Sequence, residues 1–412
     1  MKPVKYISDG YQLYKTVFGT THETMLDLKS DELIESGDVV TTSGYYSSGD
    51  GGNAIYLIVN TENAPEDKFV VQCKNGKSAV LIEEGPIDIR KLGASNTLED
   101  NSNIIQCALD KFGTVVIPDG TFYIKSTIRL NSGNTLKGNS KKSIIKLADN
   151  SECENIILCD TIDHFTLSNF RIDGNKENNS KGTGIVIRSD NHMSFWSTVE
   201  NMFVEKCKDD GLFQDINPWQ TTIKDCIFSQ CSGKGINNYA TDVSFRGIYI
   251  SNCKTGFYEK GSSNKISDIK ISGSGLEDEI EDDGVYGNGF YSIGNARDLL
   301  SNIECQENRT NGFKFVTCNH ISMSSCCSDR NGLAIYKNPN YVSSGVLFDQ
   351  CSDFIGNIII ENYRRDNTQK YGVYIKEGNN FMDFSIDNCE VEYFLEGTPK
   401  INCKINGESV TN

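Results

Sequence analysis

The sequence predicts an all-β fold class, a right-handed parallel β-helix in which short strands wind into coils stacked along one axis. The first observation is a recurring phrase of a polar residue, a glycine three or four residues later, and alternating apolar residues. It begins at Cys207, Cys231, Cys253, Asn308 and Ser328. The second observation is a loose period: spacings of 27, 24, 21, 33, 23, 20 and 40 residues separate Gly184, Gly211, Gly235, Gly256, Gly289, Gly312, Gly332 and Gly372. Such a period is typical of a solenoid, whose coils bury their apolar faces by stacking.

Two segments precede the predicted coils. Residues 1–25 are expected to form a polar N-terminal arm, and residues 26–85 a small N-terminal domain rich in β-structure. Asn75 and Gly76 form a dipeptide that favours the tight turn of a β-hairpin. Within this domain we expect a short helix near its start, followed by extended segments at 37–42, 54–59, 69–73 and 79–82.

The β-helix is expected to occupy residues 86–395, followed by a short C-terminal tail at 396–412. A capping helix at about 100–112 is expected at its start, behind an acidic N-terminal signal. Three apolar residues there recur at the spacing of one helical face: Ile104, Ile105 and Ala108. Such a helix would cover the strand edges of the first coil, which otherwise invite end-to-end pairing.

Composition and charge argue against several classes of function. The 412 residues carry 56 acidic and 40 basic side chains, and this net charge of −16 disfavours binding to nucleic acid or anionic membranes. No apolar run is long enough to span a membrane, and the N-terminus lacks the apolar core of a secretory signal. The fifteen cysteines are expected to be free thiols made in a reducing cytosol, with Cys207, Cys231 and Cys253 stacked in one column.

Three stretches of the chain resemble phage tailspike and appendage proteins of the pectate-lyase-like superfamily. Residues 37–52 resemble the small domain that precedes the β-helix in many phage and prophage tail proteins. Residues 92–95 and 113–124 resemble the start of the β-helix itself. Together these patterns cover about residues 35–145, and the coil repeat extends the likeness to about residue 395.

This resemblance implies a homotrimer in the tail of a virion, made in the cytoplasm of a bacterial host and acting at the cell surface. It implies that the protein binds, and often depolymerises, a bacterial surface polysaccharide, and that it contacts other phage tail proteins. It implies no insertion into a membrane. The sequence departs from the longest family members because it lacks a large particle-binding domain, and nothing after residue 395 resembles a trimerising foot or a self-cleaving chaperone.

The strongest candidate for chemistry is segment 208–219, which places three carboxylates and a tryptophan within one coil. A glycosidase needs one protonated and one ionised carboxyl beside the scissile bond, and like-charged neighbours raise the pKa of one of them. We expect Asp210 and Asp215 to be the general acid and the base or nucleophile, supported by Asp209 and by Asp173 one coil earlier. The alternative is a structural role, because Asp–Gly pairs are common turn formers.

Four further residues are expected to bind the substrate. Trp196 and Trp219 lie 23 residues apart, about one coil, and would stack on the apolar C–H faces of sugar rings. Asp225 would line the same groove one coil later, and Lys234 would face an anionic group. Packing in the core or against another subunit is the alternative role of the tryptophans.

Hydrolysis is favoured over β-elimination, but other functions stay open on the sequence. A polysaccharide lyase needs a base and a cation that neutralises a uronate, and adjacent coils offer Lys206, Lys208, Lys234 and Lys260. A teichoic-acid phosphodiesterase is a further alternative. A non-catalytic receptor-binding or structural tail fibre on the same scaffold is another.

No cofactor or metal is expected, and no two of the four histidines have the spacing of metal ligands. An acidic insertion after Gly256 could gather calcium through hard oxygen ligands, although a solvated loop is favoured. The acids concerned are Glu277, Asp278, Asp282 and Asp283. A second insertion, after Gly332, contains Tyr336, Asn340, Tyr341, Tyr363, Arg364 and Arg365. Such loops often form a binding rim, and packing against a partner subunit is the equal alternative.

Overall fold

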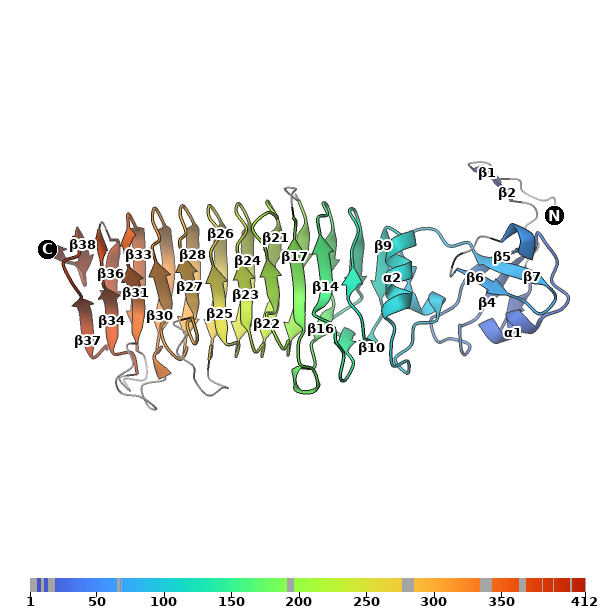
Figure 1. The fold of residues 1–412 in the computed structure, drawn as a ribbon, viewed down its shortest axis with the longest axis horizontal. Helices are drawn as coiled ribbons and strands as arrows, with labels where there is room; N and C mark the ends of the chain where they lie inside the picture. Colours follow the sequence, from blue (N-terminus) through green and yellow to red (C-terminus); the bar gives the residue numbers. More distant parts are fainter. Residues whose placement is uncertain are drawn as a thin grey trace.

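The chain forms a small N-terminal unit followed by a long rod of stacked coils, which confirms the predicted parallel β-helix (Figure 1). The N-terminal unit lies at one end of the rod, and the chain proceeds coil by coil toward the other end. The structure is a computed structural model. It describes residues 6–8, 11–13, 19–64, 67, 69–190, 196–275, 285–333, 343–362, 368–379, 381–387, 389–400 and 402–411.

The N-terminal unit is a small sheet accompanied by one short helix. The helix α1 (Met25–Ser30) begins at a capping box, in which Thr24 Oγ1 accepts from the Asp27 N–H and the Asp27 carboxylate accepts from the Thr24 N–H. In sheet order the strands are β3 (Thr21–His22), β4 (Val39–Thr42), β5 (Ile55–Asn60), β7 (Lys77–Leu81) and β6 (Val70–Gln72). The remaining elements are the hairpin β1 (Tyr6–Ser8) and β2 (Tyr11–Leu13), and the 3₁₀ turn η1 (Thr61–Asn63).

Hydrogen bonds join this unit to the start of the β-helix. The Asp50 carboxylate closes a turn by accepting from the N–H groups of Tyr45, Tyr46, Ser47 and Gly52. The Tyr46 hydroxyl then donates to the Gly93 carbonyl at 2.8 Å. Gly93 has a φ of +86°, and a Cβ there would lie 2.7 Å from the ring of Tyr45, so only glycine suits this junction.

The capping helix predicted at 100–112 is α2 (Ser102–Lys111), which lies over the first coil. Ile105, Ala108 and Leu109 are buried on the face that points into the β-helix. The buried Asn101 ties the helix to the coil, because its N–H donates to the Tyr123 carbonyl at 2.7 Å. The helix therefore covers apolar surface that the first coil would otherwise expose to water.

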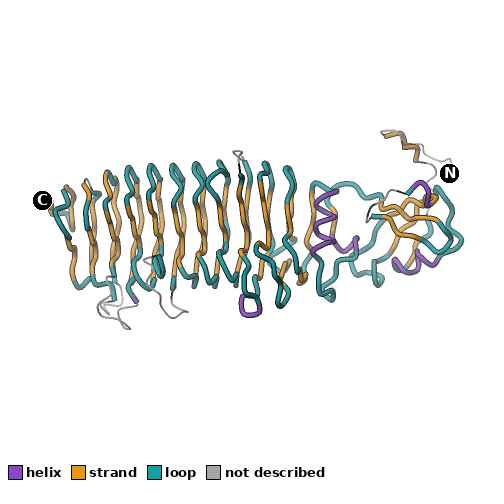
Figure 2. Tube along the Cα trace, in the orientation of Figure 1, coloured by secondary structure: helices purple, strands orange, loops and turns teal. Residues whose placement is uncertain are grey.

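Two long sheets run along the rod, and Figure 2 shows them joined by loops at both edges. The first sheet contains β8 (Ile87–Asp88), β9 (Thr114–Ile117), β10 (Gly120–Ile124), β12 (Thr135–Gly138), β13 (Ser143–Leu147), β15 (Thr166–Ser168), β16 (Arg171–Asp173), β18 (Thr198–Glu200), β19 (Phe203–Glu205), β21 (Thr222–Lys224), β22 (Ile227–Ser229), β24 (Ser244–Ser251), β26 (Lys265–Ser272), β28 (Leu299–Gln306), β30 (Ser322–Asp329), β33 (Ile355–Glu361), β36 (Asp383–Ile386), β38 (Asn402–Ile405) and β39 (Glu408–Thr411). The second sheet contains β11 (Ile128–Arg129), β14 (Asn155–Asp160), β17 (Thr183–Arg188), β20 (Leu212–Gln214), β23 (Lys234–Asn238), β25 (Thr255–Glu259), β27 (Phe290–Ile293), β29 (Phe313–Val316), β31 (Ser344–Asp349), β34 (Tyr371–Ile375) and β37 (Val391–Leu395). The shorter elements are η2 (Ile89–Leu92), η3 (Lys176–Asn178), β32 (Cys351–Ser352) and β35 (Gly378–Asn379).

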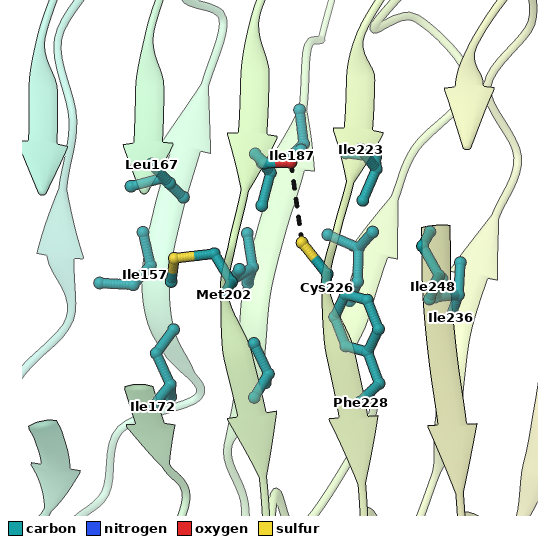
Figure 3. Packing of buried hydrophobic residues seen from close by; sticks show 14 of the residues in the cluster. Ile157, Leu167, Ile172, Ile187, Met202, Ile223, Cys226, Phe228, Ile236 and Ile248 are labelled. Atoms are coloured by element: carbon teal, nitrogen blue, oxygen red, sulfur yellow. Dashed lines mark hydrogen bonds between the residues drawn. The ribbon is translucent and has the colours of Figure 1, made fainter. Parts of the chain in front are cut away.

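The core is a set of columns in which equivalent residues of successive coils stack in parallel register. On the second sheet one such column runs through Ile185, Leu212, Ile236, Phe257 and Phe290, all fully buried. Figure 3 shows how side chains of the two sheets meet between the strands. Because side chains alternate across a strand, the residues between these core positions point outward.

The glycine phrase of the sequence marks a crowded corner of each coil. The thiols of Cys207, Cys231 and Cys253 occupy this corner as the predicted column, and each is buried. A Cβ on Gly235 would lie 2.4 Å from Ile250 Cγ2 and 3.4 Å from Cys253 Sγ. The strand can therefore leave the corner only at a residue that has no side chain.

One stretch of the interior is polar. Gln214, Asn238 and Glu259 stack in register on the inward side of the second sheet, and all are buried. Glu259 accepts from Asn238 Nδ2 at 3.0 Å and from the Gly261 N–H at 2.6 Å. Burial raises the pKa of Glu259 well above its ordinary value, and burial raises the pKa of Asp298 nearby to about 7.

Candidate functional site: a lysine–aspartate hollow

One edge of the rod carries the turns that lead from the first sheet into the second, and we refer to it as the turn edge. The turn from β19 to β20 contains Cys207, which points into the core, and then Lys208, Asp209 and Asp210. The equivalent turn from β16 to β17 carries η3, which projects from the rod in Figure 2. The polar phrase of the sequence therefore folds into stacked turns on one side of the molecule.

A hollow of about 280 Å³ lies on this edge, and it contains the acids that the sequence singled out. We name it the lysine–aspartate hollow. Three successive coils contribute its lining: Lys208, Asp209 and Asp210, then Ser232, Gly233 and Lys234, then Lys254 and Thr255, with Val285 beside them. The hollow thus brings two carboxylates and three ammonium groups together at the surface.

Asp210 is the less exposed of the two acids in the hollow. Its carboxylate accepts from the Lys234 N–H at 2.7 Å and from Asn237 Nδ2 at 2.6 Å. Burial raises the pKa of Asp210, while the charge of Lys234 and these hydrogen bonds act in the opposite direction. A carboxyl whose pKa is raised in this way is suited to hold a proton and donate it.

Neighbouring backbone groups shape the hollow around the two acids. A Cβ on Gly233 would lie 2.4 Å from Asp210 Oδ1, so this glycine leaves room for the carboxylate. Asp209 is exposed, and its carboxylate accepts from the Gly182 N–H at 2.8 Å. Both acids hold the turns in place as well as lining the hollow.

The lysines of the hollow are directed at ring faces or at solvent. Lys234 lies over the ring of Tyr258 at 5.0 Å, and Lys254 lies over the ring of Tyr286 at 5.3 Å. Within the described part of the chain, no carboxylate lies within 4.0 Å of the ammonium group of Lys208, Lys234 or Lys254. Their charge is therefore available to an anionic ligand.

The structure does not bring Asp215 to Asp210. The two acids flank β20 at opposite ends, and at about 3.3 Å per residue they lie roughly 16 Å apart along the strand. This exceeds the separation of about 5 to 9.5 Å that paired carboxyls of glycosidases need. Asp215 instead accepts from the Ile216 N–H at 2.7 Å and follows Arg188 in the register of the second sheet.

The two tryptophans lie on the same edge of the rod as Asp215, and not on the turn edge that carries the hollow. Trp196 precedes β18 and Trp219 precedes β21, so both are on the edge opposite the turn edge. Trp196 is 64% exposed, has a φ of +52°, and its ring lies 5.5 Å from that of His164. The pairing of the two tryptophans with Asp210 that the sequence predicts is therefore not made.

Asp173 and Asp225 also lie outside the hollow. Asp173 is buried at the end of β16, where it forms an ion pair with Lys146 at 3.2 Å. Asp225 is exposed in the turn between β21 and β22 of the first sheet, with a φ of +55°. The charge of Asp173 is thus neutralised by Lys146, and Asp225 occupies a turn position.

Sequence reasoning missed a neighbour of Asp173. Glu205 follows Asp173 in the parallel register of the first sheet and is buried, with its carboxylate bound to Arg171. Lys146, the partner of Asp173, also lines a second hollow of about 530 Å³, with Tyr123, Lys125 and Asp149 among its other lining residues. Glu205 ends the strand sequence Phe-Val-Glu, and nothing in that sequence indicates that its carboxylate is buried.

The remaining sequence predictions fall outside the described residues. These are the calcium ligands Glu277, Asp278, Asp282 and Asp283, and the rim residues Tyr336, Asn340, Tyr341, Tyr363, Arg364 and Arg365. Among the residues that the structure does describe, no group of three or more histidine, cysteine or acidic side chains is placed to hold a metal ion. No helix in the same part of the chain is long and apolar enough to cross a membrane.

Two family models match the β-helix. Residues 87–275 match the rhamnogalacturonase A/epimerase, pectate lyase-like family, and residues 216–392 match the right-handed β-helix region. The β-helix of this chain is therefore similar in sequence to pectate-lyase-like and other right-handed β-helix proteins. A comparison with curated proteins gave no significant match.

Solved structures with the same fold include phage tailspikes. The enzymatically active domain of tailspike protein 2 from bacteriophage CBA120 aligns with a TM-score of 0.74 at 14% identity, over 95% of this chain and 62% of that one. A tailspike from an Acinetobacter phage aligns with a TM-score of 0.66 at 13% identity, over 96% and 76%. The A-module of a mannuronan C-5 epimerase from Azotobacter vinelandii aligns with a TM-score of 0.53 at 16% identity, over 78% and 97%. The chain spans about three fifths of this CBA120 domain and shares the fold of the aligned part.

Proposed function

We propose that this chain is a phage or prophage tail protein that binds a bacterial surface polysaccharide and cleaves it by hydrolysis in the lysine–aspartate hollow. The observation that carries the proposal is the placement of Asp209 and Asp210 in one surface hollow, with the pKa of Asp210 raised by burial. A glycosidase needs one carboxyl that stays protonated and a second that is ionised.

The two acids take different roles in the proposed reaction. Asp210 is the general acid that protonates the leaving oxygen of the glycosidic bond, because burial raises its pKa. Asp209, which is exposed to solvent, activates a water molecule or attacks the sugar directly. Asp215 has no part in this chemistry, since it lies at the far end of β20.

The likeness to tailspike structures supports a place for the chain in the tail of a virion. We propose that it is made in the cytoplasm of a bacterial host, acts at the cell surface, and assembles as a homotrimer with other tail proteins around it. Light scattering of the purified chain measures the assembly. A mass three times that of the 45.8 kDa chain is expected, and a monomer at micromolar concentration contradicts the trimer.

The activity is tested on a panel of bacterial capsular and cell-wall polysaccharides. New reducing ends, the absorbance of unsaturated uronates and free phosphate are followed together. We expect reducing ends without that absorbance, and a loss of about a hundredfold or more in rate for Asp210→Asn, the typical effect of removing a general acid. Asp242→Asn, an exposed turn residue outside the hollow, is the matched control and should keep full activity.

β-Elimination is the second candidate, and the three lysines of the hollow favour it. A lyase removes a proton next to a uronate carboxylate, which a cation must neutralise, and Lys208, Lys234 and Lys254 line the site. Growth of unsaturated-uronate absorbance, abolished by a lysine substitution and kept in Asp210→Asn, would establish this reaction. Phosphate-linked fragments would instead indicate a phosphodiesterase, and tight binding without any product would indicate a receptor-binding fibre.

A further inference from the structure

A row of aromatic rings crosses the outer face of the second sheet beside the hollow. Phe213 and Tyr239 lie on consecutive coils with ring centroids 5.9 Å apart, and Tyr239 and Tyr258 are 6.0 Å apart. Lys260 lies over the ring of Tyr239 at 5.3 Å, and Lys234 lies over the ring of Tyr258 at 5.0 Å. We name these five residues the aromatic–lysine row.

The register of the second sheet explains why these side chains face outward together. Phe213, Asn237 and Tyr258 are paired across β20, β23 and β25, and each alternates with inward-facing core residues. Tyr239 and Lys260 lie two residues beyond Asn237 and Tyr258 along the chain, so they face the same side. Backbone hydrogen bonds extend the register to them: the Tyr239 N–H donates to the Gln214 carbonyl, and the Lys260 N–H donates to the Asn238 carbonyl. The three rings are half-buried and Lys260 is exposed, so ring faces and the ammonium group reach the surface.

The row is continuous with the lysine–aspartate hollow. Lys234 belongs to both, since it lines the hollow and covers Tyr258. Asn237, which lies between Phe213 and Tyr258 in the register of the second sheet, donates its side-chain amide to Asp210 at 2.6 Å. A ligand that reaches Asp210 from the second sheet must therefore pass over these rings.

The charges on this face favour an anionic ligand. Lys208, Lys234, Lys254 and Lys260 have no carboxylate within 4.0 Å among the described residues. Several lysines of the first sheet are paired with acids, namely Lys146–Asp173, Lys224–Glu200 and Lys270–Glu304. Asp215 continues the same register beside Tyr239, and Arg188 on the preceding coil is paired with Asp160 at 2.7 Å. In a chain of net charge −16, these four ammonium groups lie close together on one face, although the charge of Lys234 also lowers the pKa of Asp210.

We infer that the aromatic–lysine row binds an acidic polysaccharide, with sugar rings stacked on the aromatic faces and their acidic groups beside Lys234 and Lys260. Aromatic rings offer apolar platforms to C–H faces, and ammonium groups select negative charge over a neutral sugar of the same shape. The inference rests on the proposed function for the place of cleavage, and it adds the chemical class of the substrate and the surface that holds it.

Binding is measured with the full chain and oligomannuronates of four and eight residues as the probe, with dextran oligosaccharides as the neutral counterpart. Asp210→Asn is used as the background, so that cleavage does not interfere. We expect the octamer to bind in preference to dextran, with an affinity that falls as salt rises. Lys260→Gln and Tyr239→Leu should each weaken octamer binding by about three- to tenfold, the usual worth of one such contact.

Lys265→Gln, which removes an exposed lysine of the first sheet, is the matched control and should bind as before. Equal affinity for dextran, no binding of oligomannuronate, or full binding by Lys260→Gln would overturn the inference. A change of oligomeric state in Lys260→Gln would also overturn it, because the row would then be an interface between copies. Failure of the proposed function is distinguishable: the native chain would bind the octamer through the row yet cleave no polysaccharide.

Discussion

At the scale of single residues, Asp210 shows how a turn can both fold the chain and prepare a carboxyl for chemistry. Its two hydrogen bonds fix the turn from β22 to β23, while burial raises its pKa. The Lys234 ammonium acts in the opposite direction and lowers the pKa of Asp210. The protonation of Asp210 is therefore set by a balance that one neighbouring charge can shift.

Removal of that neighbouring charge should be visible in the pH profile. In Lys234→Gln the backbone N–H still binds Asp210, but the positive charge is lost, so the pKa of Asp210 should rise further. Because a general acid must be protonated, the alkaline limb of kcat/KM should move to higher pH than in the native chain. A profile that falls in height without moving would show that Asp210 is not the acid, and Lys265→Gln should leave the limb in place.

At the scale of the element, the corner between the sheets depends on glycine. The thiol column and the core isoleucines fill the space into which a Cβ of Gly235 would point. Overpacking of this kind forces neighbouring side chains out of their preferred rotamers. The recurrence of glycine in the sequence is thus a packing requirement, and not only a turn preference.

Gly235→Ala should lower the free energy of unfolding by about 1 to 3 kcal/mol, the usual cost of forcing an extra methyl group into a packed core. Chemical denaturation followed by circular dichroism measures the change. Gly113→Ala is the matched control, because a Cβ there meets no atom within 4 Å and the residue is not in the left-handed region. Equal stability of the two variants would contradict the packing account.

The same element-scale view explains which site residues the sequence could predict. Asp209 and Asp210 lie in the turn of one coil and Lys234 begins β23 of the next, and the glycine repeat aligned these coils correctly. Asp215 seemed to be part of the same cluster, but β20 is short and carries it to the opposite edge. Proximity in sequence is a poor guide in a β-helix, where five residues are enough to cross one sheet.

At the scale of the whole molecule, a polar interior makes stability depend on pH. Burial raises the pKa of Asp298 to about 7 and that of Glu259 well above its ordinary value. Both groups bind protons more tightly in the folded chain than in the unfolded one, so their contribution is complete below about pH 4 and is lost as the pH rises. The apolar periodicity of the sequence gave no sign of this interior, because Gln214, Asn238 and Glu259 occupy core positions.

The unfolding temperature should therefore fall between about pH 4 and pH 8, more steeply than the surface charges alone require. Glu259→Gln keeps the shape of the side chain and removes the buried titration, so its curve should be flatter. Glu62→Gln, an exposed residue of the N-terminal unit, should follow the native curve. Native stability that rises across this range would contradict the assignment of raised pKa values.

The spread of the hollow over three consecutive coils has a consequence for how such a molecule can diverge. A duplicated or deleted coil elsewhere in the rod would change its length and leave Lys208, Asp210 and Lys254 in the same arrangement. A coil inserted between β20 and β25 would displace Lys254 from Asp210 by one strand spacing, about 4.8 Å, and open the site. The number of coils can therefore change on either side of these coils without altering the hollow, but not within them.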